Sequence, residues 1–93
     1  MDYSGLAEKL REVHTFPCCY TFKIVGVSVL LQETLIREAV VLVLPDTKLT
    51  LTSRASSAAR FTAWTLDVEV PDVESVIALY TGLQALPGLK ALL

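Results

Sequence analysis

The chain has 93 residues, of which 53% are hydrophobic and 19% are charged, and this length suits one small domain. Its formal charge is −2, and Lys and Arg are scattered along it, so we expect neither nucleic acid nor a membrane as a partner. The longest apolar stretch, residues 39–45, is too short to span a bilayer. Because a small domain has little interior, part of its apolar content should lie on the surface, which predicts a homo-oligomer.

The first residues and the cysteines indicate the compartment. No basic segment followed by an apolar one opens the chain, so no secretory signal is predicted and we expect a cytoplasmic protein. The plastid stroma is the alternative if a transit peptide has been removed. Cys18 and Cys19 are adjacent, and a disulfide between neighbours would close a strained ring, which favours reduced thiols over a redox switch or metal thiolates.

The N-terminal segment has helical spacing. Tyr3, Leu6, Leu10 and Val13 are separated by charged residues, which predicts a short amphipathic helix over 4–13 with Ser4 as its N-cap. The dipeptide at 16–17 ends it, since a residue before proline avoids the helical conformation. We therefore divide the chain into a helical extension, 1–15, and one domain, 16–93.

The first half of this domain indicates a strand followed by a helix. Residues 20–27 alternate, with Tyr20, Phe22 and Ile24 on one side. Gly26 is interpreted as a tight turn and Ser28 as the N-cap of a helix over 29–44. Its end, 40–44, is rich in β-branched residues and could equally be a strand, but its apolar face continues the helical period.

The second half repeats these patterns in another order. Residues 48–54 and 60–70 alternate as strands, and the small, polar residues 55–59 predict a hairpin loop between them. Asp72 is a good N-cap for a helix over 73–85. Residues 88–93 predict a last strand, with Leu89, Ala91 and Leu93 facing inward. The order is that of a ferredoxin-like βαββαβ sandwich, an α+β fold with a four-stranded antiparallel sheet and two helices on one face.

Such a sheet leaves its second face uncovered, and the alternation indicates which side chains it displays. This face is rich in threonine and mildly apolar, which suits a partner sheet, a second subunit or a small ligand. The residues expected there are Thr21, Lys23, Val25, Thr50, Thr52, Ala63, Thr65, Lys90 and Leu92.

Gly26, Val27 and Ser28 form the second candidate site. If a helix begins here, its first backbone N–H groups point outward, and glycine allows a ligand to come close. The sequence then predicts either a simple turn with a serine cap, or a site for the carboxylate or phosphate of a small metabolite.

Catalytic, metal and cofactor sites are not predicted. His14 is the sole histidine, and its pairing with Cys18 has no third group to orient it. Asp67 and Glu69 alternate on one strand face, which is common on exposed strands. Phe61 is the lone aromatic residue expected on the uncovered face, which argues against stacking of RNA bases.

Three segments resemble the YbeD-like family, small bacterial and plastid proteins grouped as a domain of unknown function. Residues 16–26, Phe-Pro-Cys-Cys-Tyr-Thr-Phe-Lys-Ile-Val-Gly, are similar to the family's opening. Ser53, Ser56 and Ser57 with Arg60-Phe61 resemble its entry into the third strand. Val73-Glu74-Ser75-Val76, Leu79-Tyr80 and the following Leu-Pro-Gly-Leu resemble its end. The chain departs from the family at Ala58-Ala59, where the hairpin usually has glycine.

The resemblance implies a fold like that of ACT domains, which sense amino acids, and it implies no established activity. ACT domains bind ligands at subunit interfaces near the first strand-to-helix turn, which corresponds to residues 26–28. Two hypotheses follow. The first is a non-enzymatic regulatory module that senses a metabolite at this turn, and the second is an interaction domain that docks one protein through its uncovered face or an edge strand.

Overall fold

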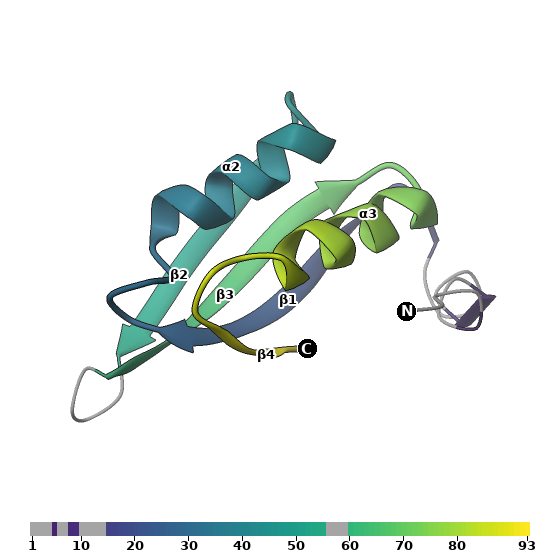
Figure 1. Cartoon of the computed structure of the whole chain (residues 1–93). Coiled ribbons are helices and arrows are strands. Elements are labelled where there is room, and N and C mark those ends of the chain that lie inside the picture. The colour runs from purple at the N-terminus through teal and green to yellow at the C-terminus, as the bar shows by residue number, and fades with distance from the viewer. Residues whose placement is uncertain (1–4, 6–7, 10–14, 56–59) are drawn as a thin grey trace.

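The computed structural model describes residues 5, 8–9, 15–55 and 60–93. Its elements in chain order are β1 (Cys18–Val27), α2 (Glu33–Val43), β2 (Leu49–Ala55), β3 (Phe61–Val70), α3 (Val73–Gln84) and β4 (Leu89–Leu92). The strands form one antiparallel sheet in the order β2-β3-β1-β4, and both helices lie on the same side of it (Figure 1). The predicted ferredoxin-like βαββαβ sandwich is confirmed.

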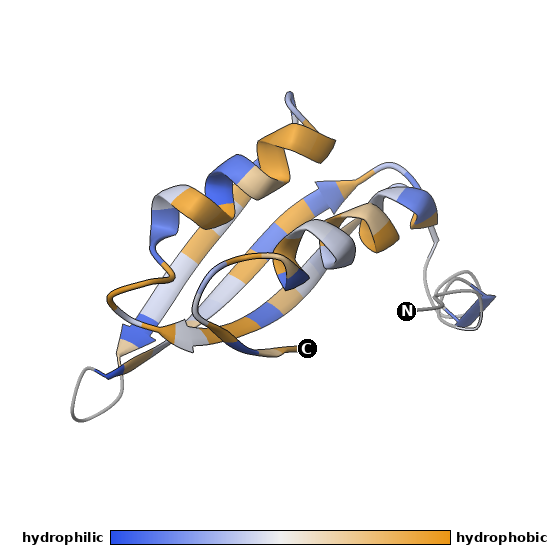
Figure 2. Cartoon of the chain, viewed as in Figure 1, coloured by the Kyte–Doolittle hydropathy of each residue, from blue (hydrophilic) through white to orange (hydrophobic). Residues whose placement is uncertain are grey.

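The core lies between the sheet and the helices, where the strand alternation placed it. Phe22 and Ile24 of β1 are fully buried, as are Leu66 and Val68 of β3. Figure 2 shows the resulting alternation of hydrophobic and hydrophilic residues along the strands. The other buried members of the core are Leu31, Ile36, Val40, Val70, Val73, Val76, Leu79 and Leu83.

Helix α3 is anchored at its start and along its length. The Asp72 carboxylate accepts hydrogen bonds from the backbone N–H and the hydroxyl of Ser75, at 2.8 and 2.7 Å, so the predicted N-cap is confirmed. Further along, the Tyr80 ring meets Phe22 edge-on, with centroids 4.8 Å apart. The hydroxyl oxygens of Tyr20 and Tyr80 are 3.0 Å apart. These contacts hold α3 against β1.

The first helix begins later than the sequence predicts. The expected helix over 29–44 is α2, Glu33–Val43, so its helical C-terminal part is confirmed but Ser28 is not its N-cap. The Val27 carbonyl accepts the N–H groups of Leu30 and Leu31, at 3.0 and 2.8 Å, in a separate turn. This turn buries Leu31 over the end of β1, and the helix starts only after it.

Gly26 lies inside β1, and its interpretation as a tight turn was wrong. It pairs with Thr62 of β3 and Leu89 of β4. A Cβ atom at this position would lie 2.3 Å from Cδ2 of Leu31, closer than real atoms approach. Glycine is therefore required here because Leu31 packs against the strand, and a left-handed backbone plays no part.

In the last strand, the side chains that face the core are not the ones predicted. Leu92 pairs with Ile24 and packs against the core, whereas Ala91 pairs with Val25 of the uncovered face and Leu93 is exposed. Lys90 is the extra residue of a β-bulge between the Gly26 and Val25 pairings. Because one inserted residue reverses the alternation, the prediction of Leu92 on the uncovered face was wrong, as was that of Ala91 and Leu93 facing inward.

Two predicted segments fall mainly outside the described residues. They are the N-terminal helix over 4–13, together with His14, and the hairpin loop, of which only Ala55 is described, as the last residue of β2. No helix in the described part of the chain is long and apolar enough to cross a membrane.

Candidate binding surface

The uncovered side of the sheet, called the open face below, carries side chains from all four strands. Strand β1 contributes Thr21, Lys23 and Val25, β2 contributes Thr50, Thr52 and Arg54, β3 contributes Ala63, Thr65, Asp67 and Glu69, and β4 contributes Ala91. All of them are exposed or half-buried. The sequence prediction of this face left out Arg54, Asp67 and Glu69, although the alternation along β2 and β3 reaches all three.

The strand register arranges these side chains in transverse rows. Thr50, Asp67 and Thr21 form one row, and Thr52, Thr65 and Lys23 form the next. Arg54, Ala63, Val25 and Ala91 form a third row. The centre of the open face is thus lined with threonine hydroxyls.

Two adjoining hollows lie over Ala63. One, of about 240 Å³, extends toward Lys23, Thr52 and Thr65, and the other, of about 270 Å³, extends toward Phe61. Arg54 and Val25 border both. They arise because a single methyl group stands between larger side chains on both neighbouring strands.

The charges of the open face are separated along the strands. The Lys23 ammonium donates to the Thr65 hydroxyl at 3.1 Å, and the Arg54 guanidinium forms no ion pair or hydrogen bond with the described residues. In the row next to that of Lys23, the Thr21 hydroxyl donates to the Asp67 carboxylate. Glu69, exposed, lies one row beyond. One end of the open face is therefore cationic around a hollow, and the other, the acidic end, carries both carboxylates with one cation, Lys48, beside Glu69.

The predicted site at Gly26, Val27 and Ser28 has its backbone donors engaged. The Val27 N–H donates to the Gly88 carbonyl at 2.8 Å, and the Ser28 N–H donates to the Arg60 carbonyl at 2.9 Å. The Ser28 hydroxyl lies 2.7 Å from the Thr62 hydroxyl. Since α2 begins at Glu33, these residues do not form a helix N-terminus, and neither Val27 nor Ser28 has a free backbone N–H to offer an anion.

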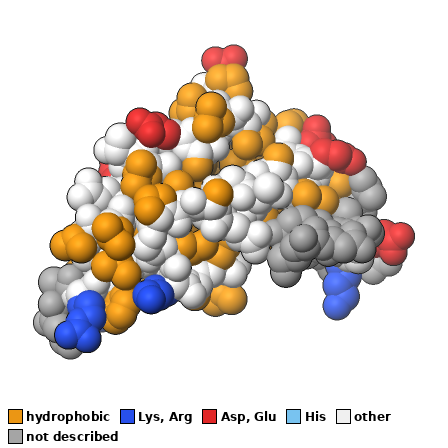
Figure 3. All heavy atoms as spheres, in the orientation of Figure 1, with side chains coloured by type: hydrophobic (Ala, Val, Ile, Leu, Met, Phe, Trp, Pro, Cys, Tyr) orange, Lys and Arg blue, Asp and Glu red, His pale blue; other side chains and the backbone are white. Residues whose placement is uncertain are grey.

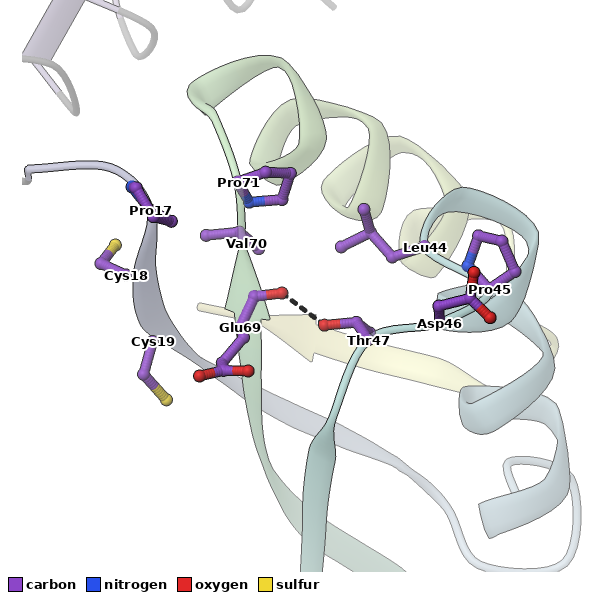
Figure 4. Close-up of a pocket in the computed structure, with 10 residues that line it drawn as sticks. All are labelled: Pro17, Cys18, Cys19, Leu44, Pro45, Asp46, Thr47, Glu69, Val70 and Pro71. Carbon is purple, nitrogen blue, oxygen red and sulfur yellow. Dashed lines mark hydrogen bonds between the residues drawn. The ribbon is translucent and has the colours of Figure 1, made fainter.

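A wider hollow of about 590 Å³ lies at the acidic end of the sheet (Figure 4). It is built by the start of β1, the segment before β2 and the end of β3, and the Thr47 hydroxyl donates to the Glu69 carbonyl across it at 2.6 Å. The free thiols of Cys18 and Cys19 border it and point apart. Sequence reasoning missed this hollow, since segments distant in the chain form it. Among the described residues, no group of three His, Cys, Asp or Glu side chains could hold a metal ion.

Leu93, whose backbone pairs with Lys23, is exposed at the edge of the open face, and the other exposed large apolar side chains lie away from it. Val41 and Leu42 project from α2, and Val29 and Leu30 from the turn before it. Figure 3 shows hydrophobic side chains scattered over the helical side of the molecule, with charged ones at its margins.

Comparisons with known proteins agree with this architecture. A solution structure of protein HP0495 from H. pylori superposes with a TM-score of 0.74 over 87% of this chain and 86% of that one, at 14% identity. The UPF0250 protein PM1928 of Pasteurella multocida is 31% identical over 87 residues, 91% of this chain and 96% of that protein. The family model described as "Protein of unknown function (DUF493)" matches residues 11–93. The chain therefore belongs to the DUF493 family, which confirms the predicted YbeD-like resemblance.

Proposed function

We propose that this chain is a non-enzymatic binding module that docks one protein partner through its open face. The observation that carries the proposal is a sheet surface that no described helix or strand covers, lined with threonine hydroxyls and hollowed over Ala63. Exposed and half-buried hydroxyls form hydrogen bonds readily with an incoming surface, and a hollow next to two cations accepts one projecting side chain.

On the open face, the two hollows over Ala63 favour a protein over a small metabolite. Each of the two over Ala63 is smaller than the roughly 300–1,000 Å³ of most small-molecule sites and opens widely to solvent. At Gly26, Val27 and Ser28, the intramolecular hydrogen bonds of Val27 and Ser28 compete with an anionic ligand. We therefore adopt docking as the function, and metabolite sensing at this turn has no support from the geometry.

A pull-down with matched variants tests the proposal. The tagged chain is incubated with an extract of cells that express it natively, beside a Thr52→Arg/Thr65→Arg variant, in which two bulky cations stand in the middle of the open face. The control is Thr34→Arg, the same change on the exposed surface of α2. We expect a stoichiometric protein to be retained by the wild type and the control and lost from the open-face variant. Equal retention by all three would refute docking through this face.

A further inference from the structure

The open face is complementary to itself in charge. Its cationic half contains Lys23 and Arg54 beside the Ala63 hollow, and its acidic half contains Asp67 and Glu69, with one cation, Lys48, at the sheet edge. A surface with both signs in separate halves suits an inverted copy of itself, because a two-fold axis brings each half against its opposite.

Strand β3 carries both the residue under the hollow, Ala63, and the two carboxylates that would face the cationic half of a second copy. Ala63 and Glu69 lie at equal distances on either side of Leu66, and so do Thr65 and Asp67. A two-fold axis running across the strands at Leu66 would set Glu69 of the partner subunit over the Ala63 hollow. The partner's Asp67 would come opposite Thr65, next to Lys23.

We propose that the partner of the open face is a second copy of this chain, packed face to face and inverted about an axis at Leu66. The inference rests on the proposed docking through the open face and names its occupant. In this dimer the exposed Glu69 carboxylate of each subunit enters the other subunit's hollow and pairs with Arg54, whose guanidinium has no partner among the described residues of its own chain.

The centre of the interface also matches itself. The same axis sets Thr50 of one copy opposite Thr52 of the other, so hydroxyl faces hydroxyl and each can donate or accept. Lys48, in the row of Glu69, would approach Arg54 at the sheet edge, where solvent screens the two charges.

The size of the surface sets the expected strength. Four strands about 4.8 Å apart, over the eight steps of about 3.4 Å from Phe61 to Glu69, give a planar area of roughly 400–500 Å². A standard stable interface buries about 800 Å² per partner. We therefore expect a weak, reversible dimer that dissociates as salt is raised.

Charge reversal tests both the surface and its register. Sedimentation velocity over a range of concentrations should show a monomer–dimer equilibrium for the wild type. Glu69→Lys should weaken the dimer about tenfold or more, because it places like charges around the hollow. Arg54→Glu should also weaken it, but by less, since the partner's Lys48 approaches residue 54. Glu38→Lys, with the same charge change on the exposed face of α2, is the control and should leave the dimer unchanged.

Mixing the two weakened variants is the decisive experiment. In the mixed dimer one contact is the native pair of Glu69 and Arg54, and the other joins the two substituted side chains, whose charges are again opposite. Association should therefore return to within about threefold of the wild type. Circular dichroism verifies that each variant is folded, and Glu69→Gln, which removes the charge without reversing it, should give a smaller loss.

Three results would overturn the inference: a wild type that stays monomeric at every concentration, a Glu69→Lys variant that dimerises normally, or mixed variants that do not recover. The wild type could be monomeric and still retain a different protein from the extract, which the Thr52→Arg/Thr65→Arg variant does not retain. In that case self-association fails and docking through the open face stands. If that variant retains the same proteins as the wild type, docking through the open face fails as well.

Discussion

Leu66 and Thr65 are neighbours on β3 and lie on opposite faces of the sheet. Leu66 is fully buried beneath the helices, whereas Thr65 is half-exposed and accepts a hydrogen bond from Lys23. The covered face is filled with apolar side chains from four strands and two helices. The open face presents hydroxyls, charges and a hollow. This difference indicates that stability depends on one face and that recognition can vary on the other, since loss of an exposed contact leaves no cavity in the core.

The largest expected effect tests this contrast directly. Leu66→Ala should lower the free energy of unfolding by about 2–5 kcal/mol, because it leaves a cavity among fully buried residues. Thr65→Ala, one position away on the open face, should lower it by no more than about 1 kcal/mol. Urea unfolding followed by circular dichroism measures both. Equal losses would mean that the open face is also part of the stabilising core.

The junction between β1 and the turn before α2 gives the next largest effect. Gly26→Ala should cost about 1–3 kcal/mol, because the new Cβ would overlap the Leu31 side chain, and relief requires the turn to move. A double-mutant cycle with Leu31→Ala measures the coupling. The two losses should be less than additive, since removing Leu31 beyond its Cβ removes the closest contact. Strict additivity would contradict the close packing of Leu31 on the strand.

The N-cap of α3 should have a smaller and pH-dependent effect. The hydrogen bonds from the Ser75 hydroxyl and backbone lower the pKa of Asp72 below its ordinary value of 3.8. A lowered folded-state pKa contributes stability that is present above pH 3.8 and is lost as the pH falls through the folded-state value.

Asp72→Ala should therefore cost about 1 kcal/mol at neutral pH, and the difference from the wild type should shrink in acid below pH 3.8. Unfolding curves of both proteins at several pH values provide the measurement. A difference that stays constant down to the lowest pH would show that the carboxylate is not the stabilising group.

The smallest effect has the opposite sign. Gly82 lies within α3, and a Cβ placed there would meet no atom within 4 Å. Gly82→Ala should raise the stability by about 0.4–1 kcal/mol, because alanine restricts the unfolded chain and favours the helix. An increase in the thermal midpoint checks this. Comparison of Gly82→Ala with Gly26→Ala distinguishes a glycine that can be replaced from one that packing requires.

The alternation along the strands and the helical spacing were sufficient to predict the order of the elements. They also predicted which side chains of the three long strands lie on each face of the sheet. Phe22, Ile24, Leu66 and Val68 are buried as their parity predicts, and the alternation through Thr50 and Thr52 is that of the open face. The N-cap at Asp72 was also predictable, since its acceptor and donor are three residues apart. These features depend on residues close together in the sequence.

The start of α2, the role of Gly26, the parity of β4 and the hollow over Ala63 were decided by tertiary structure. Each depends on a partner distant in the chain: Gly88 and Arg60 capture the N–H groups of Val27 and Ser28, and pairing with β1 inserts the bulge at Lys90. Local patterns determine which way a side chain points along an isolated strand or helix. Only the assembled sheet decides the register, and a shift of a single residue moves every later side chain to the other face.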